Sequence, residues 1–289
     1  MPEKSSHVLN VIAENAEALA RALGGLGQPV WLAEGRAFDI PVGNDTSALN
    51  RARDIIGSES VDMNLIPLAN RRKTLLVADM DSTIIGCECL DELADMAGLK
   101  PQVAAITERA MRGEIEFAPA LRERVALLKG LPLSALDRVY QERVRFNPGA
   151  KALVATMRAH GAKTMLVSGG FTYFTRRVAD AAGFDSEQAN ILLDDGEKLL
   201  GTVAEPILGR EAKLEALEQA THTAGLDFAD TLAVGDGAND LAMIGRAGLG
   251  VAYHAKPIVA QAASASIAHG DLTALLYLQG YREDEISAV

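Results

Sequence analysis

Three short apolar runs, each followed at once by a glycine-containing polar motif, constrain the fold of this chain more than any other feature. The runs are residues 74–78, 162–167 and 231–234. Such runs are typical of strands that are buried on both faces of a parallel sheet, and segments of helical pattern alternate with them. Two weaker candidates, 249–252 and 266–268, extend the series. The sequence therefore predicts an α/β fold with a mostly parallel central sheet.

The N-terminal 70 residues follow a different pattern, which predicts a small α+β unit. Apolar spacing over 8–23 predicts a helix, and 47–56 predicts another. Two short stretches, 30–33 and 37–40, predict strands on either side of a turn. This unit carries no motif to which a chemistry can be assigned.

A wholly helical insert separates the first core strand from the second and predicts a cap over the end of the sheet. The pattern of 101–113 is that of an amphipathic helix, 119–129 has proline in its first turn, and Ser134 with Asp137 resembles a capping box. We therefore expect three parts: an N-terminal unit (1–70), a core (71–84 and 148–289) and a helical cap (85–147).

Composition limits the classes of partner. With 28 Lys and Arg against 39 Asp and Glu, the net charge of −11 argues against a broad nucleic-acid or anionic-membrane surface. No apolar run approaches the ~18 residues of a membrane span. The two cysteines, Cys87 and Cys89, lie too close together to join distant segments, and the start lacks a signal-peptide pattern. A cytoplasmic location is expected.

The first motif, 79–83, places two carboxylates directly after a predicted strand. Asp79 and Asp81 could hold a hard cation together, or one could attack phosphorus while the other moves a proton. The alternative is that Asp81 or Ser82 only caps the next helix.

The second motif, Ser168-Gly169-Gly170-Phe171, could bind an anion through its hydroxyl and backbone amides, and the alternative is an ordinary strand-to-helix turn. The third, 235–240, has three polar side chains in a glycine-rich loop and favours a metal site. It is not a dinucleotide fingerprint, because the third glycine of that motif is missing. Lys213 alone would be a solvated helix residue. Ligands of such folds gather at the carboxyl ends of the strands, so we expect the motifs to meet at one edge of the sheet.

The order of DMDST, SGGF, a lone lysine and GDGAND resembles that of the phosphoserine phosphatase family, within the haloacid dehalogenase-like (HAD) superfamily. The resemblance runs from about residue 71 to residue 278 and includes the cap. It implies a HAD-like Rossmannoid core. It also implies hydrolysis of O-phospho-L-serine to L-serine and phosphate, the last step of serine biosynthesis, through an aspartyl-phosphate and with Mg²⁺.

The resemblance also implies roles for the core residues. Asp79 would be the nucleophile, and Asp81 would protonate the leaving oxygen and then activate water. Mg²⁺ would be held by Asp79, the Asp81 carbonyl and Asp236, supported by Asp240. The groups implied to bind the phosphoryl oxygens are Ser168, the Gly169 amide, Lys213 and Asn239.

In the cap, the resemblance places Glu88, Met111, Phe117 and Arg124 around the substrate. Glu88 would pair with the ammonium group of phosphoserine, and Arg124 would bind its carboxylate through two hydrogen bonds. Phe117 would supply an apolar wall. The alternative for Arg124 is an ion pair on a helix surface.

Three other functions compete with this one. A phospho-accepting receiver also uses an aspartate, a hydroxyl and a lysine, but the second acid and the cap favour turnover. A non-catalytic amino-acid sensor would use the N-terminal unit. A phosphatase of the same superfamily could act on phosphothreonine, phosphohomoserine or a sugar phosphate.

Overall fold

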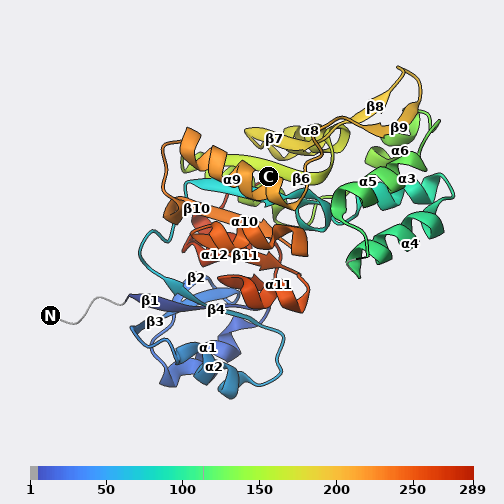
Figure 1. The fold of residues 1–289 in the computed structure, drawn as a ribbon. Coiled ribbons are helices and arrows are strands. Elements are labelled where there is room, and N and C mark those ends of the chain that lie inside the picture. Colours follow the sequence, from blue (N-terminus) through green and yellow to red (C-terminus); the bar gives the residue numbers. More distant parts are fainter. Residues whose placement is uncertain (1–5, 113) are drawn as a thin grey trace.

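The computed structural model describes residues 6–112 and 114–289, and a six-stranded sheet lies at its centre. The strands of this sheet are β5 (Leu75–Asp79), β6 (Lys163–Phe171), β7 (Ser186–Asn190), β10 (Thr231–Gly235), β11 (Leu249–Tyr253) and β12 (Ala265–Ile267). Their order is β12-β11-β10-β5-β6-β7, and every neighbouring pair is parallel (Figure 1). The predicted α/β fold with a mostly parallel sheet is confirmed. Strand β7 was not predicted.

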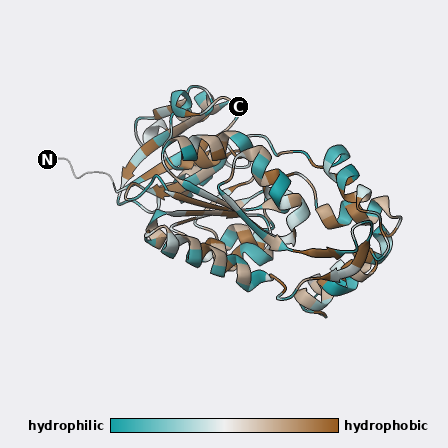
Figure 2. Cartoon of the chain, turned by 90° about the horizontal axis from the view of Figure 1, so that it is seen from above, coloured by the Kyte–Doolittle hydropathy of each residue, from teal (hydrophilic) through white to brown (hydrophobic). Residues whose placement is uncertain are grey.

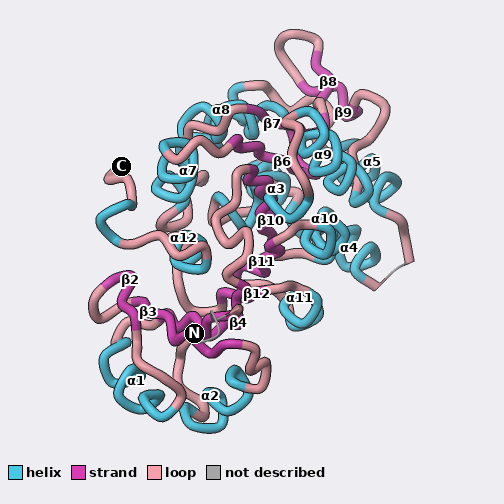
Figure 3. Tube along the Cα trace, turned by 90° about the vertical axis from the view of Figure 1, so that its left-hand side faces the viewer, coloured by secondary structure: helices cyan, strands magenta, loops and turns pink. Residues whose placement is uncertain are grey.

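Helices cover both faces of this sheet (Figure 3). One face packs against α7 (Ala150–Ala159), α8 (Thr172–Ala182) and α12 (Ala274–Leu278), and the other against α9 (Arg210–Thr223), α10 (Leu241–Arg246) and α11 (Pro257–Ala262). In β5, Leu76 and Ala78 enter the first core, whereas Leu75 and Val77 enter the second. This two-residue alternation explains why the strand is apolar throughout, and Figure 2 shows apolar strands beneath helices with hydrophilic outer faces.

The N-terminal unit is a four-stranded antiparallel sheet with two helices on one face. Its elements are β1 (His7–Ile12), α1 (Ala16–Ala22), β2 (Val30–Ala33), β3 (Ala37–Gly43), α2 (Ala48–Ile56) and β4 (Asp62–Pro67). The strand order is β2-β3-β1-β4. The other face of the sheet packs against the core near α12.

The prediction of one helix over 8–23 was wrong for its first part, which is β1. Leu9 and Val11 face α1 and α2, whereas Val8 and Ile12 face the core. A strand buried on both faces has apolar residues at both parities, and here that pattern imitates helical spacing. The predicted strands near 30 and 37 and the helix before Gly57 are confirmed.

The N-terminal sheet joins the central sheet where the edge strands β4 and β12 meet. The Asn64 side chain donates to the Ser266 carbonyl and accepts from its amide, at 3.1 and 2.8 Å. The Asp62 carboxylate accepts hydrogen bonds from the backbone amides of 268–270. These side chains satisfy backbone groups that an exposed edge would leave open.

A group of helices and a hairpin lies beyond the carboxyl end of the central sheet (Figure 1). Its elements are α3 (Cys89–Met96), α4 (Lys100–Met111), α5 (Phe117–Ala126), α6 (Ser134–Glu142), β8 (Leu192–Asp194) and β9 (Leu199–Val203). The hairpin was not predicted. It binds the chain after α5 through the Gly130 amide, which donates to the Leu199 carbonyl at 2.8 Å.

The capping box predicted at the start of α6 was wrong, because Leu133 precedes the helix and no side chain caps it. The Asp137 carboxylate instead accepts a hydrogen bond from the Tyr173 hydroxyl. The predicted end of the preceding amphipathic helix at residue 113 lies outside the described residues. Among the residues described, no helix is long and apolar enough to cross a membrane.

Candidate active site

A buried lysine joins two carboxylates at the carboxyl end of β5. The Lys213 ammonium, on α9, lies 2.6 Å from an oxygen of Asp79 and 2.6 Å from an oxygen of Asp240. Asp79 ends β5 and Asp240 follows the neighbouring parallel strand β10, so the sheet itself brings them together. Lys213 is only 2% exposed, and its interpretation as a solvated helix residue is therefore wrong.

The chain leaves β5 in a tight turn, Met80–Ile84, that brings Asp81 beside the second motif. One oxygen of the Asp81 carboxylate accepts a hydrogen bond from the Ser168 hydroxyl at 3.2 Å. The other accepts from the Cys89 backbone amide at 3.0 Å. Because Cys89 begins α3, Asp81 also satisfies a free N–H at a helix start, and the helix-capping interpretation is correct in part.

Two glycines allow this close approach. The Gly170 amide donates to the Ser168 hydroxyl oxygen at 2.8 Å, and a Cβ at Gly170 would lie 2.9 Å from an Asp81 oxygen. A Cβ at Gly235 would lie 2.3 Å from the Asp240 carboxyl carbon. Any larger residue at these positions would push the carboxylates out of place.

The buried charges at this edge are unbalanced. Burial, and then the charge of Asp240, raise the pKa of Asp79 well above its usual value, against the attraction of Lys213. Burial alone would lower the pKa of Lys213, but Asp79 and Asp240 together outweigh it and the net shift is upward. One permanent ammonium thus serves two carboxylates, and negative charge remains uncompensated.

Two further acids lie near this uncompensated negative charge. Burial, and then the charge of Glu88, raise the pKa of Asp81 to about 6. Burial, and then the charge of Asp240, raise the pKa of Asp236 to about 6. Clusters of acids with raised pKa values at the end of a sheet are typical of functional sites.

The donor set fits a hard divalent cation. Carboxylate oxygens of Asp79, Asp236 and Asp240 lie within 4.8 Å of one another. Such a set of oxygen ligands suits this class of ion. Burial, and then the charge of Asp240, raise the pKa of both Asp79 and Asp236, and a bound cation would oppose that shift. Asp240 also accepts hydrogen bonds from Lys213 and the Gly237 amide, which hold it in place.

The cap side of the site carries groups of both signs. The Glu88 carboxylate accepts a hydrogen bond from the Ser82 hydroxyl at 2.7 Å. Arg124 is partly buried, and its guanidinium donates to the Ala120 carbonyl at 3.3 Å and to the Thr107 hydroxyl at 3.5 Å. Burial lowers the pKa of Arg124 against the attraction of nearby acids, including Glu88. Within the part of the chain that is described, Arg124 forms no ion pair, so the surface ion-pair alternative was wrong.

Phe117 connects the cap to the core. Its ring lies over the backbone of the second motif, where a Cβ at Gly169 would be 3.1 Å away, and over Gly209, where a Cβ would be 3.3 Å away. Asn239 is partly buried in the third motif, and its side-chain oxygen lies over Gly237. Met111 ends α4, and its side chain lies outside what the structure describes.

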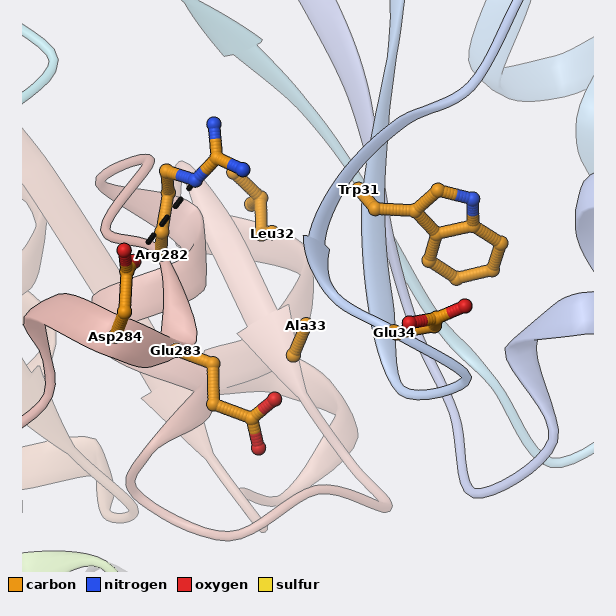
Figure 4. A pocket seen from close by; sticks show the side chains of 7 residues that line it. All are labelled: Trp31, Leu32, Ala33, Glu34, Arg282, Glu283 and Asp284. Atoms are coloured by element: carbon orange, nitrogen blue, oxygen red, sulfur yellow. Dashed lines mark ion pairs between the residues drawn. The ribbon is translucent and has the colours of Figure 1, made fainter.

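A cavity of about 510 Å³ lies elsewhere, between the N-terminal unit and the end of the chain (Figure 4). Trp31 and Glu34 line one side of it, and Arg282, paired with Asp284, lies on the other. None of its lining residues belongs to the three motifs. The chemistry indicated by the carboxylate cluster is therefore separate from this cavity.

Comparison with known proteins decides the family. The family described as haloacid dehalogenase-like hydrolase matches residues 76–245, which contain all three motifs and the cap. The chain belongs to this family. The resemblance seen in the sequence is confirmed.

Several relatives of this hydrolase carry a more specific name. It is 48% identical to a phosphoserine phosphatase of a Polaromonas strain over 209 residues, which cover 71% of this chain and 89% of the relative. A crystal structure of a probable phosphoserine phosphatase from Vibrio cholerae has a TM-score of 0.80 at 32% identity and covers 98% of this chain and 88% of that one. A structure described as a phospho-aspartyl intermediate analogue of phosphoserine phosphatase has a TM-score of 0.66 at 38% identity and covers 71% of this chain and 98% of that one.

The structure thus brings the core residues of the three motifs and Lys213 to one edge of the sheet, with Glu88, Phe117 and Arg124 on the cap side. Sequence reasoning missed two groups there. One is the Cys89 amide, which donates to Asp81, and the other is Asn190, whose side chain donates to the Gly169 carbonyl of the second motif. The Cys89 contact uses a backbone amide, which every residue except proline has, so no residue type in the sequence predicts it. The second is a lone asparagine in a strand that was not predicted.

Proposed function

We propose that this chain is a phosphoserine phosphatase that acts through an aspartyl-phosphate. The observation that carries the proposal is the placement of two acids in different environments within one site. Asp79 contacts the Lys213 ammonium, whereas Asp81 contacts the Ser168 hydroxyl and a backbone amide. One acid is placed to attack phosphorus and the other to move a proton.

In the first half of the reaction, an oxygen of Asp79 forms a bond to phosphorus while the bond to the serine oxygen breaks. Asp81, with a pKa of about 6, holds a proton over part of the neutral range and gives it to the leaving oxygen. In the second half, Asp81 takes a proton from water, the water oxygen attacks phosphorus, and Asp79 is released. Placement of the reacting groups before reaction can supply roughly 7–11 kcal/mol of the barrier reduction in a well-oriented site.

The phosphoryl oxygens would be bound by Ser168, the Gly169 amide, Lys213 and Asn239. Asp79, the Asp81 carbonyl and Asp236 would hold Mg²⁺, with Asp240 fixing the arrangement. A bound divalent cation supplies charge neutralisation for a carboxylate that approaches a phosphate dianion. Lys213, which contacts Asp79, would contribute to the same neutralisation.

We assign specificity to the cap. Glu88 would bind the substrate ammonium, and Arg124, which has no carboxylate partner among the described residues, would bind the substrate carboxylate. Phe117, with Met111, would close the pocket. We propose that 85–147 acts as the cap on a core of 71–84 and 148–289, that 1–70 is a separate N-terminal unit, and that the enzyme works in the cytoplasm.

The test is phosphate release from a panel of phosphorylated amino acids and sugar phosphates, with Mg²⁺ and with excess chelator. Phosphoserine should be the preferred substrate, and chelator should abolish its turnover. Preference for a sugar phosphate would contradict the substrate assignment. A stable phospho-protein after acetyl phosphate treatment, with no phosphate release, would favour a receiver instead.

A further inference from the structure

Asn190 is a buried polar side chain that joins two loops of the candidate site. It ends β7 and is 2% exposed. Its side-chain nitrogen donates to the Gly169 carbonyl at 2.9 Å and to the Leu208 carbonyl at 3.1 Å. Its side-chain oxygen accepts from the Leu208 amide at 2.7 Å. The side-chain amide therefore uses both of its N–H donors and its oxygen acceptor in hydrogen bonds to the backbone.

The first of these segments contains Gly169 and lies where β6 departs from its regular pairing with β7. Val167 pairs with Gln188, and pairing resumes where Phe171 meets Asn190. Residues 168–170 of β6 thus face a single residue of β7, which is a bulge. A bulge turns backbone groups toward a site but removes their ladder partners. The Asn190 amide restores a partner to the Gly169 carbonyl.

The second loop leads into the helix that carries the lysine. Leu208 lies two residues before α9, and Lys213 lies in the first turn of that helix. Asn190 therefore connects the segment with Ser168 and Gly169 to the segment with Lys213. The Phe117 ring touches both segments, at Gly169 and at Gly209.

We propose that Asn190 is a positioning residue that fixes the spacing between the phosphate-binding loop and the Lys213 helix. The inference rests on the proposed function, which makes Ser168, the Gly169 amide and Lys213 ligands of one phosphoryl group. Asn190 touches neither substrate nor Asp79, and it acts through the two backbone segments that it holds. A shift of about 1 Å in such groups lowers the rate by about a hundredfold.

The experiment compares Asn190→Ala with Asn10→Ala, a matched control outside the site. Asn10 is also fully buried, and its side-chain nitrogen donates to Asp39 at 2.8 Å and to the Tyr277 carbonyl at 3.2 Å. The measurements are the melting temperature, kcat and KM for phosphoserine and for p-nitrophenyl phosphate, the inhibition constant of inorganic phosphate, and the Mg²⁺ concentration for half-maximal activity.

Asn190→Ala should lower kcat/KM about ten- to hundredfold on both substrates, because both present the same phosphoryl group. It should raise the inhibition constant of phosphate and leave the Mg²⁺ requirement unchanged. Asn10→Ala should lower the melting temperature and leave these kinetic values unchanged. Asn190→Asp keeps the acceptor for the Leu208 amide but loses both donors, so it should show the same kinetic loss if the alanine variant does not fold.

A folded Asn190→Ala or Asn190→Asp variant with the wild-type inhibition constant for phosphate would overturn the proposal. So would a loss of stability without kinetic change, the pattern expected of Asn10→Ala. Failure of the proposed substrate is distinguishable: wild-type enzyme would then hydrolyse p-nitrophenyl phosphate but not phosphoserine. The aryl phosphate and inorganic phosphate would still decide the role of Asn190.

Discussion

Buried carboxylates occur in two regions of this chain, and their surroundings are opposite. At the junction of the N-terminal unit with the core, the Asp62 carboxylate accepts hydrogen bonds from the consecutive backbone amides of 268–270. Nearby, Asp39 is paired with Arg71 through two guanidinium nitrogens. Each acid there has donors of its own, and the arrangement is one that holds two units together.

At the carboxyl edge of the central sheet, the acids instead outnumber the positive charges that contact them. Asp79 and Asp240 share the single ammonium of Lys213, and Asp81 and Asp236 each have a pKa of about 6. Such crowding of like charges opposes folding, and a bound cation would relieve it. The difference between the two regions thus distinguishes acids that join two units of the fold from acids to which we assign roles in the reaction.

The strongest test of this difference is Asp79→Asn. Turnover should fall by at least about 10³-fold, because an amide cannot form the acyl-phosphate. The melting temperature should stay equal or rise, because a buried carboxylate with a raised pKa is removed. Phosphate-release assays and thermal unfolding measure the two effects. Substantial turnover in a folded variant would remove Asp79 from its role.

Asp81→Asn should have the next largest effect, a loss of about 10²–10⁴-fold on phosphoserine. The leaving oxygen would lack its proton donor, whereas the hydrogen bonds to Ser168 and Cys89 could largely persist. An aryl phosphate, whose leaving group needs little protonation, should lose less in the same assay. Equal losses on both substrates would contradict the acid–base role.

Sequence reasoning could find this edge because of a topological rule. The three motifs lie far apart in the chain, yet each follows a strand of one parallel sheet, and such strands end together. It could not find what holds the motifs in place. The Cys89 amide and the Asn190 side chain act through the tertiary fold, and neither has a spacing or composition that marks it.

The elements that were mistaken or missed share a physical cause. In β1, burial on both faces hid the two-residue alternation that identifies a strand. The β8–β9 hairpin is short, and its pairing with the chain after α5 is a long-range contact that no local pattern encodes. At Ser134, tertiary contact of Asp137 with Tyr173 replaced the local capping bond.

Arg124→Ala tests whether the cap side of the site binds the carboxylate of the substrate. Loss of a bidentate contact to the substrate carboxylate costs on the order of 1.5–3 kcal/mol, roughly a ten- to hundredfold drop in kcat/KM on phosphoserine. A small aryl phosphate has no carboxylate and should be almost unaffected. Glu88→Gln should behave similarly but more mildly, since the amide oxygen still accepts a hydrogen bond. An equal fall on both substrates would mean that these residues position the cap.

Metal binding should depend on pH in a direction set by the raised pKa values. Asp81 and Asp236 shift from 3.8 to about 6, so the folded protein binds protons more tightly than the unfolded chain. Without metal, their contribution to stability is therefore lost as pH rises through this window. A cation held by Asp236 replaces those protons, and the gain in melting temperature with Mg²⁺ should be larger at about pH 7.5 than at about pH 5. Asp236→Asn should reduce the gain, and an equal gain at both pH values would contradict the charge surplus.

The smallest effect on turnover is expected from Asp62→Ala, which changes an acid at the junction of the N-terminal unit with the core. Removal of this carboxylate leaves the amides of 268–270 without their acceptor and should cost about 2–3 kcal/mol, a fall of roughly 3–5 °C in melting temperature for a chain of this length. Phosphoserine kcat/KM at a temperature where the variant is folded should equal that of the wild type, because Asp62 lies in the junction and touches no residue of the three motifs. If turnover fell together with stability, the N-terminal unit would be coupled to the reaction, and its acids could not be assigned to stability alone.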